Sequence, residues 1–269
     1  MDSAVVKNTA ERRSVDPVWS KIREAAQAAA NAEPVLAGTL HATILSQPRF
    51  ENALSYHLAR LVGTTEVPAA LIRQTFDEAL NADPTIGLAA RADIMAVAER
   101  DPACTSHLDP LLWFKGYQAL QVYRVGHWLW KQGRHALAHY LQSRASSLFG
   151  LDIHPAALIG KGLFLDHGTG IVIGETAVVE DGVSMLHGVT LGGTGKERGD
   201  RHPKVRRGVL LGAGAKVLGN IEIGMCAKIA AGSVVLEPVP AGCTAAGVPA
   251  RIIGCVDVPE PALEMDQRI

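Results

Sequence analysis

The sequence has little net charge and no long apolar run. Its 26 Lys and Arg residues are balanced by 27 Asp and Glu residues, so no overall field attracts a polyanion or an anionic membrane. No uninterrupted run of about 18 apolar residues occurs, the length that a membrane-spanning helix needs. The first residues, MDSAVVKNTAERRSVD, lack the apolar segment of a secretory signal. We therefore expect a cytoplasmic protein that binds neither nucleic acid nor membranes.

Closely spaced cysteines are also absent. The four cysteines are Cys104, Cys226, Cys243 and Cys255, and none of them forms a CxxC pair. A chain of 269 residues with 48% hydrophobic content can build one large core or two modest ones without disulfide bonds. We expect reduced thiols.

Apolar residues recur at helical spacing from Asp16 to about Gly150. Three stripes are clear: Trp19, Ile22, Ala26 and Ala29; Phe50, Leu54, Leu58 and Leu61; and Leu71, Ile72, Phe76, Ala79 and Leu80. Asp83 and Asp109 each precede a proline, which predicts a capping carboxylate at a helix start. Gly133 and Gly150 indicate helix ends. The aromatic-rich segment 111–130 predicts a packing or oligomer surface rather than a ligand-stacking site.

After Gly150 the apolar period changes to six. The inward positions are predicted to be Ile153, Ile159, Leu165, Ile171, Ala177, Val183 and Val189, then Val205, Leu211, Val217, Ile223, Ile229 and Val235. This pattern is typical of a solenoid whose short strands turn at tight corners. The period does not fix the number of faces or the handedness of the coil.

One insertion interrupts the repeat. We interpret the long interval from Val189 to Val205 as one repeat of six plus an insertion of ten, and it contains GGTGKERGDRHPK over residues 192–204. A loop rich in glycine and charge on a rigid scaffold predicts a functional segment, although a solvated surface loop is the simpler alternative.

These residues resemble the bacterial serine acetyltransferases. The resemblance covers DIHPAALIGKGLFLDHGTGIVIGETAVVEDGVSMLHGVTLGGTGKERGDRHPK, AGVPARIIG, ERDPA and PLLWFKGYQALQVYRVGHWLW, hence both parts of the chain. It implies an α+β protein with an all-helical N-terminal domain (residues 1–150) and a left-handed parallel β-helix of hexapeptide repeats (151–256) that carries the loop 192–204. It also implies trimers with active sites between the prisms, paired into a homohexamer through the helical domains.

The implied activity is transfer of acetyl from acetyl-CoA to the hydroxyl of L-serine, the first step of cysteine biosynthesis, with inhibition by L-cysteine. A serine hydroxyl needs a base to become a nucleophile, and His167 in LDHGTG is the candidate because imidazole titrates near neutral pH. Asp152 resembles the family's aspartate that orients this histidine. With coils of eighteen residues, Asp152 lies one coil below position 170.

The resemblance also assigns substrate contacts. Asp101 and Asp166 would pair with the ammonium of serine, and Arg201 would bind its carboxylate, with His202 assisting. For acetyl-CoA the small residues Gly193, Ala213 and Ala231 suit a close approach of the pantetheine arm. Lys228, like Lys216, is a candidate neighbour of the phosphates. No metal is expected.

The segment 257–269 follows the last repeat. Its prolines and acidic residues predict a flexible tail that does not pack against the prism. The final residue, Ile269, matches the family's terminal isoleucine, which inserts into the active site of O-acetylserine sulfhydrylase. The resemblance therefore implies this enzyme as a partner.

Three alternatives stay open. Another hexapeptide-repeat acetyltransferase would use homoserine or an amino sugar as acceptor. A zinc enzyme of the γ-carbonic anhydrase type would use three histidines, for which His154, His167, His187 and His202 are candidates. A non-enzymatic scaffold is disfavoured because His167, Asp152 and Arg201 occur together.

Overall fold

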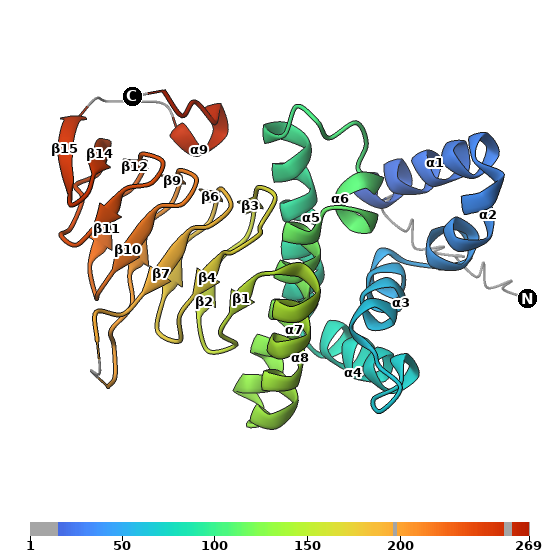
Figure 1. The fold of residues 1–269 in the computed structure, drawn as a ribbon. Coiled ribbons are helices and arrows are strands. Elements are labelled where there is room, and N and C mark those ends of the chain that lie inside the picture. Colours follow the sequence, from blue (N-terminus) through green and yellow to red (C-terminus); the bar gives the residue numbers. More distant parts are fainter. Residues whose placement is uncertain (1–15, 196–197, 256–259, 269) are drawn as a thin grey trace, which may run out of the picture.

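The computed structural model describes residues 16–195, 198–255 and 260–268, so Ile269 and its predicted role lie outside the described residues. A helical half is followed by a three-sided parallel β-helix, and helices α5, α7 and α8 form the junction between them (Figure 1). The predicted order of an all-helical part and a parallel β-helix is confirmed. Within the described ranges no helix combines the length and hydrophobicity that crossing a membrane requires.

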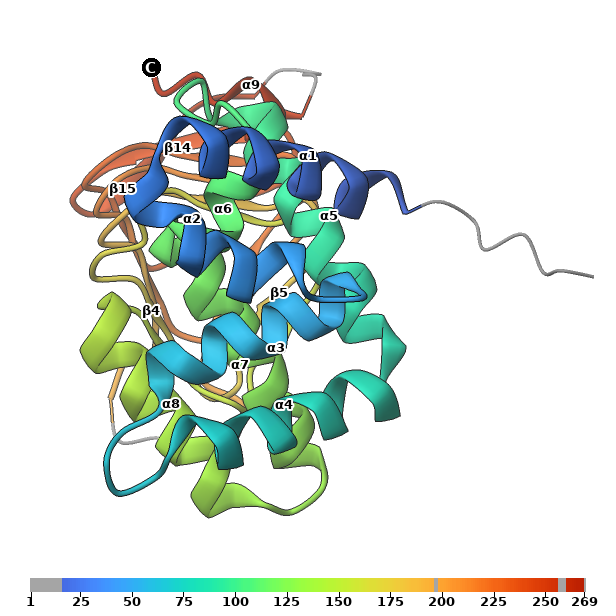
Figure 2. The same cartoon turned by 90° about the vertical axis from the view of Figure 1, so that its right-hand side faces the viewer.

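The helical half contains the predicted stripes. Its elements are α1 (Pro17–Ala32), α2 (Pro34–Leu40), a π-helical turn (His41–Leu45), α3 (Phe50–Val62), α4 (Ala69–Ala82), α5 (Pro84–Arg100), α6 (Leu108–Leu112), α7 (Lys115–Lys131) and α8 (His135–Phe149). The three stripes lie on α1, α3 and α4, and most of their residues are buried. Figure 2 shows α1, α3 and α4 stacked one above another on the outer side of this half.

The helix caps follow the prediction in one case and depart from it in another. The Asp83 carboxylate accepts a hydrogen bond from the Thr85 amide (3.0 Å) at the start of α5, as expected. The prediction for Asp109 is wrong, because α6 begins one residue earlier. Its carboxylate instead accepts from the amides of Thr105 and Ser106 (2.9 Å each) and fixes the preceding turn.

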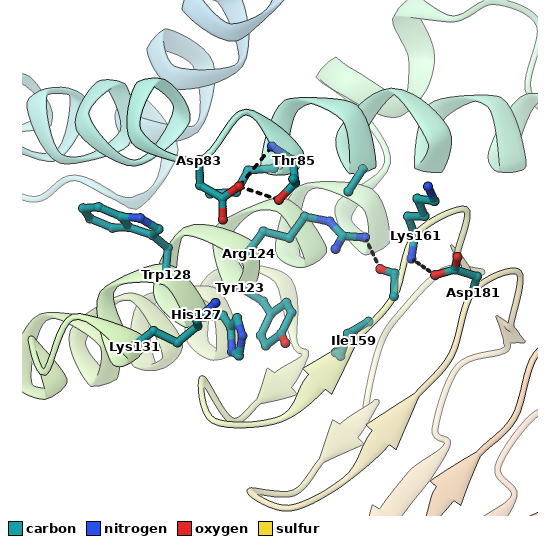
Figure 3. Close-up of a pocket in the computed structure, with 13 residues that line it drawn as sticks. Asp83, Thr85, Tyr123, Arg124, His127, Trp128, Lys131, Ile159, Lys161 and Asp181 are labelled. Atoms are coloured by element: carbon teal, nitrogen blue, oxygen red, sulfur yellow. Dashed lines mark hydrogen bonds between the residues drawn. The ribbon is translucent and has the colours of Figure 1, made fainter.

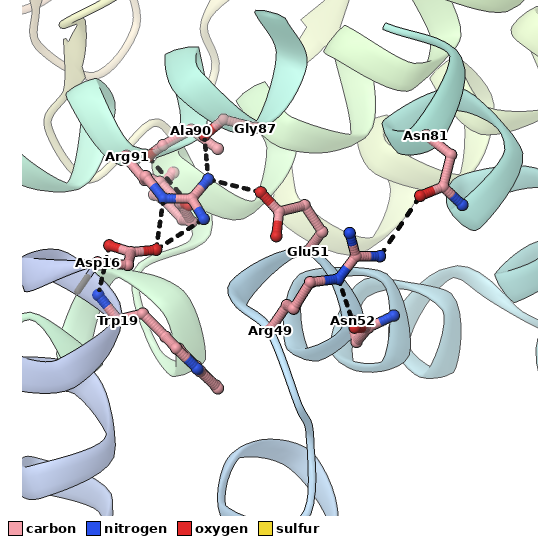
Figure 4. Close-up of polar contacts among 10 residues, drawn as sticks. Asp16, Trp19, Arg49, Glu51, Asn52, Asn81, Gly87, Ala90 and Arg91 are labelled. Atoms are coloured by element: carbon pink, nitrogen blue, oxygen red, sulfur yellow. Dashed lines mark hydrogen bonds and ion pairs between the residues drawn. The ribbon is translucent and has the colours of Figure 1, made fainter. Parts of the chain in front are cut away.

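Arg91 joins three helices of this half (Figure 4). Its guanidinium pairs with Asp16 at the start of α1 and with Glu51 on α3, both at 2.7 Å, and lies over the ring of Phe50. The arginine is only 20% exposed, so water screens these pairs less than it screens ordinary surface pairs. Arg91 therefore fixes α5 relative to α1 and α3.

The β-helix has three faces. The first contains β1 (Asp152–Ile153), β4 (Val172–Ile173), β7 (Thr190–Gly192), β10 (Lys216–Leu218) and β13 (Val234–Val235). The second contains β2 (Leu158–Ile159), β5 (Val178–Val179), β8 (Lys204–Val205) and β11 (Glu222–Ile223). The third contains β3 (Phe164–Leu165), β6 (Ser184–Met185), β9 (Leu210–Leu211), β12 (Lys228–Ile229), β14 (Cys243–Gly247) and β15 (Ala250–Cys255).

The strand register corrects the predicted coil lengths. Asp152 pairs with Val172 rather than lying below position 170, so the first coil is two residues longer than predicted. Val172 pairs with Thr190, which is the expected coil of eighteen, and Thr190 pairs with Lys216, which makes the coil with the loop eight residues longer. The loop insertion is thus eight residues rather than ten. The two extra residues of the first coil lie at the corner between Leu165 and Ile171.

The regular six-residue series conceals this second insertion because each coil has two rows of inward residues. Ile153 pairs with Ile173 and Leu165 pairs with Met185, so these residues belong to the row on the strands. Ile171 is buried at the corner, in the neighbouring row. Leu165 and Ile171 are six residues apart but are not equivalent, and the corner between them carries LDHGTG.

The junction between the two halves is close-packed. A Cβ on Gly116, in the first turn of α7, would lie 2.0 Å from the carbonyl oxygen of Leu165, so glycine is required there. Asp93 on α5 is fully buried, pairs with Arg124 on α7 (2.7 Å) and accepts from the amide of Leu163 (3.0 Å). The helices are therefore held against the first coil by backbone contact and by a buried ion pair.

The C-terminal segments differ from two expectations. Cys243 and Cys255 form a disulfide bond between the antiparallel strands β14 and β15, whereas reduced thiols were expected. Helix α9 (Pro261–Glu264) packs against the prism, with Ala262 fully buried, whereas an unpacked tail was expected. Cys104 and Cys226 are not disulfide-bonded.

Candidate active site

His167 lies at the corner that leads from the third face to the first, called here the His167 corner (residues 166–170). The two inserted residues of the first coil fall in this corner, and His167 has a left-handed backbone (φ 55°). Its side chain is 76% exposed, and its Nε2 lies 3.7 Å from Oδ1 of Asp166. The insertion therefore makes the imidazole project from the prism, where a ligand can reach it.

Asp166 lies at this corner, and the Asp101 carboxylate of the helical half is close enough to influence it. Burial raises the pKa of Asp166, the nearby Asp101 carboxylate adds to this increase, and His167 and His187 oppose it. Asp101 follows α5, and its Oδ1 accepts a hydrogen bond from the Ala103 amide (2.8 Å). The corner thus presents two acidic groups beside an exposed imidazole.

A column of small and polar residues continues along the same edge. Amides of the following glycines donate to the carbonyls of Thr169, His187 and Ala213 at 2.7–2.8 Å, which stacks Thr169, His187, Ala213 and Ala231 in successive coils. The ring centroids of His167 and His187 are 6.1 Å apart. Two of the predicted acetyl-CoA contacts, Ala213 and Ala231, therefore lie on the edge that carries the candidate base.

Arg201 and His202 lie at the next corner, between the first and second faces, called here the Arg201 corner. Arg201 pairs with Glu175 (2.8 Å). His202 is buried, and its Nδ1 lies 2.9 Å from Oγ1 of Thr176 and 3.2 Å from the Thr176 amide. Burial lowers the pKa of His202, and the neighbouring Arg201 acts in the same direction. A Cβ on Gly174 would lie 2.1 Å from this ring, so glycine makes the space for it.

Asp152 lies on the first face, in register with Val172, and among the described residues it makes no hydrogen bond with His167. Its Oδ1 accepts a hydrogen bond from Nε2 of Gln142 (2.7 Å), and Oε1 of Gln142 lies 3.1 Å from Nδ1 of His139. The Asp152 charge also acts on the nearby His154. Helix α8 therefore holds the carboxylate that was predicted to orient the base.

The structure thus divides the predicted residues into two groups. Within the described parts of the chain, no hydrogen bond or ion pair joins the His167 corner to Asp152, Arg201 or His202. The corners are separated by one strand of the first face, and the four steps along the backbone from Gly170 to Gly174 span about 13 Å when extended. The two groups of predicted residues therefore lie at different corners of the prism.

The remaining predicted cofactor contacts lie on different parts of the prism. Gly193 follows β7, and a Cβ there would contact the Arg201 side chain at 3.6 Å. Lys228 begins β12 on the third face, and its Nζ donates to the carbonyl of Arg268 in the C-terminal segment (2.5 Å). Lys216 points back along the His167 edge, where its ammonium contacts the carbonyl of Gly188.

Three residues near the site were not predicted as parts of an acetyl-transfer site. His187 was considered only as a zinc ligand, and Glu175 and Gln142 were not considered. The sequence carried a signal for His187, because HG recurs in LDHGTG and MLHGVT. For Gln142 no local signal exists, since its contact joins a helix to a strand of the other half.

A separate cavity of about 280 Å³ lies between α5, α7 and the second face (Figure 3). Arg124, Trp128 and Lys161 are among its lining residues, and none of the predicted site residues lines it. No group of three His, Cys, Asp or Glu side chains in the described ranges is arranged to hold a metal ion.

The sequence and the fold are similar to known proteins. Residues 18–122 match the family model for the N-terminal part of serine acetyltransferase. A serine acetyltransferase of Escherichia coli strain K12 is 57% identical over 250 residues, covering 93% of this chain and 92% of the relative.

Two solved structures extend this similarity to both halves. The serine acetyltransferase of Brucella abortus strain S19 in complex with coenzyme A is 59% identical, with a TM-score of 0.88 over 90% of this chain and 98% of that chain. A serine acetyltransferase in complex with cysteine is 54% identical, with a TM-score of 0.93 over 94% of this chain and 98% of that chain. The helical half and the β-helix are therefore matched together.

Proposed function

The chain belongs to the serine acetyltransferases, acetyl-CoA-dependent O-acetyltransferases with a left-handed β-helix, and we propose that His167 is the general base of its reaction. The enzyme transfers the acetyl group of acetyl-CoA to the hydroxyl of L-serine and releases O-acetyl-L-serine and CoA. The observation that supports the assignment is the exposed imidazole of His167 on an inserted corner, beside two carboxylates.

The chemistry needs one base that becomes an acid. The His167 imidazole takes the proton of the serine hydroxyl as its oxygen attacks the thioester carbonyl, which forms the new C–O bond. The C–S bond then breaks, and the imidazolium returns the proton to the leaving thiolate. Asp152 orients the imidazole by accepting from its second nitrogen.

Serine recognition is divided between the two corners. The ammonium group pairs with Asp101 and Asp166, and the carboxylate pairs with Arg201 while His202 assists. In the structure Arg201 is bound to Glu175, so the substrate carboxylate replaces that partner. Ala213, Ala231, Gly193 and Lys228 are proposed contacts of acetyl-CoA.

Because the two corners are apart, the active site forms between chains. In a trimer with threefold symmetry, the His167 corner of one prism faces the Arg201 corner of the next. Two trimers would pair through the helical halves, where Val35, Leu71 and Leu88 expose 86%, 56% and 62% of their surface. Light scattering of the purified chain should give a hexamer. A monomeric species with full activity would refute the shared site.

A mutation tests the base. His167→Ala should lower turnover about a hundredfold and leave the oligomer intact, since general acid-base catalysis contributes about that factor. A His167→Ala variant with nearly normal turnover would exclude His167 as the base.

Thiol release measured with serine, homoserine and an amino sugar identifies the acceptor.

Regulation and partners follow the family. One similar structure contains cysteine, and in this chain L-cysteine would compete with serine for the same carboxylates and for Arg201. The enzyme is proposed to be cytoplasmic and to bind O-acetylserine sulfhydrylase through Ile269. Deleting Ile269 should abolish the complex on a sizing column and leave acetyl transfer unchanged, and a retained complex would contradict this role.

A further inference from the structure

Arg100 is a buried arginine at the boundary between the two halves. It is the last residue of α5, immediately before Asp101, and only 8% of it is exposed. Its Nη1 donates to the carbonyl of Gly182 (3.3 Å) and to the hydroxyl of Ser184 (3.1 Å), both on the prism. Its Nε is buried without a partner. The side chain therefore crosses from the helical half into the second coil.

Ser184 continues this connection to the C-terminal helix. The serine is fully buried on β6, and its hydroxyl donates to the carbonyl of Ala262 on α9 (2.8 Å) while it accepts from Arg100. The Ala262 amide lies 3.4 Å from the carbonyl of Gly208. Helix α9 thus covers the arginine, and one hydroxyl connects α5, β6 and α9.

Strand β6 also holds the second carboxylate of the serine site. The carbonyl of Met185 accepts a hydrogen bond from the Asp166 amide (2.8 Å). Ser184, the preceding residue, binds Arg100, which precedes Asp101. Asp166 is therefore connected to Met185, and Asp101 is connected through Arg100 to Ser184. The two carboxylates assigned to the serine ammonium are thus held by consecutive residues of the same strand.

Stability alone does not explain an arginine at this position. Burying a guanidinium is unfavourable, and in the described parts of the chain Arg100 makes no ion pair within 4 Å while its Nε stays unpaired. An apolar side chain of similar length would fill the space without these costs. A buried charge that persists under such conditions indicates a requirement for one defined geometry.

We propose that Arg100 is a positioning residue of the serine site, which fixes Asp101 relative to Asp166 through Ser184, with helix α9 closing the arrangement. This inference rests on the proposed role of Asp101 in binding the serine ammonium. The chain leaves α5 at Asp101 in an extended conformation, and Oδ1 of Asp101 is already bound to the Ala103 amide. Oδ2 is then the oxygen offered to the substrate, and its direction depends on how the end of α5 is anchored.

Steady-state kinetics of the full-length oligomer test the proposal. Arg100→Met keeps a long unbranched side chain, although a shorter one, and removes its donors, and it should raise the KM for serine at least about tenfold. The KM for acetyl-CoA should stay within about twofold, because the contacts proposed for that ligand do not include Asp101. Ser184→Ala should raise the KM for serine by about threefold, since Arg100 keeps its bond to Gly182.

Arg206→Met is the matched control. Arg206 also makes two polar contacts, with Glu180 and Glu222, but it is 37% exposed on the second face. This variant should keep both KM values. A rise in the KM for serine equal to that of Arg100→Met would show a general effect of losing a β-helix arginine and would overturn the proposal.

Two outcomes separate this inference from the proposed serine site. If Asp101→Asn leaves the KM for serine unchanged, Asp101 does not bind serine and the proposed site is wrong. If Asp101→Asn raises that KM and Arg100→Met does not, the site stands and the positioning role is refuted. Should Arg100→Met fail to assemble, Ser184→Ala removes one hydroxyl only, and an unchanged KM for serine in that variant refutes the role.

Discussion

Chains carrying His167→Ala and chains carrying Arg201→Ala should recover activity when they assemble together. Each variant damages a different corner, and the corners are separated by a strand of the first face in the same prism. In a mixed trimer, some interfaces receive an intact His167 corner from one chain and an intact Arg201 corner from its neighbour. These interfaces should be active although neither chain carries both intact corners.

The size of the recovery follows from the symmetry. Loss of the bond between Arg201 and the substrate carboxylate costs about 2–3 kcal/mol, which lowers kcat/KM by roughly 30- to 150-fold. His167→Ala lowers turnover by about a hundredfold, so each variant alone is nearly inactive at low serine. With equal amounts and random assembly, about one quarter of the interfaces in a cyclic trimer combine two intact corners.

The assay is thiol release at serine concentrations below the KM of the unmodified enzyme. Co-expressed variants should reach about one quarter of the unmodified rate per site. The control mixes His167→Ala with the double variant His167→Ala/Arg201→Ala. No chain in this mixture has an intact His167 corner, so the mixture should stay inactive. If the test mixture gives only the mean of its two components, the site lies within one chain and the shared arrangement is wrong.

Three further predictions concern single residues. Gln142→Ala should lower kcat about tenfold with little change in either KM, because Asp152 loses the amide that orients it, and unchanged kcat would contradict this role. Cys226→Gly should raise the free energy of unfolding in urea by about 1 kcal/mol, because Cys226 has a left-handed backbone (φ 54°), and a loss of stability would contradict it. Burial lowers the pKa of His57 to about 4 from its usual 6.5, so the unfolded chain binds more protons between these values and stability falls as the pH drops from 6.5 to 4. His57→Gln should reduce the difference in the free energy of unfolding between pH 7 and pH 4, measured by urea titration, by on the order of 2 kcal/mol. An unchanged difference would show that other groups cause the pH dependence.

Periodicity predicted the architecture better than it predicted the register. The apolar stripes of α1, α3 and α4 and the repeat after Gly150 depend on local spacing, and these predictions are confirmed. The insertion of two residues before Ile171 left no trace in the six-residue series. Each coil has two rows of inward residues that lie two positions apart, so the insertion moved the series from one row to the other without changing its spacing. The resulting error placed Asp152 below position 170 instead of Val172.

Long-range contacts account for the other differences. The pairing of Cys243 with Cys255 depends on β15 turning back along β14, which no cysteine spacing indicates. Helix α9 is short and its composition is that of a flexible tail, yet Ala262 is fully buried and its carbonyl accepts a hydrogen bond from Ser184. The positions of the predicted site residues at two different corners became visible only with three faces in place, because the sequence repeat does not fix the number of faces.

Helix α9 has a consequence for synthesis on the ribosome. The helices that support the first coil are translated before it, and each later coil pairs with the one before it, so the β-helix can be added in the order in which it emerges. The last helix breaks this order, since it returns to β6 and α5 and covers Arg100. A nascent chain that ends before α9 therefore contains every coil of the β-helix, but its Arg100 guanidinium lacks the cover of that helix. The contact of α9 with Ser184 is therefore the last of these contacts to form, after every coil of the β-helix has been translated.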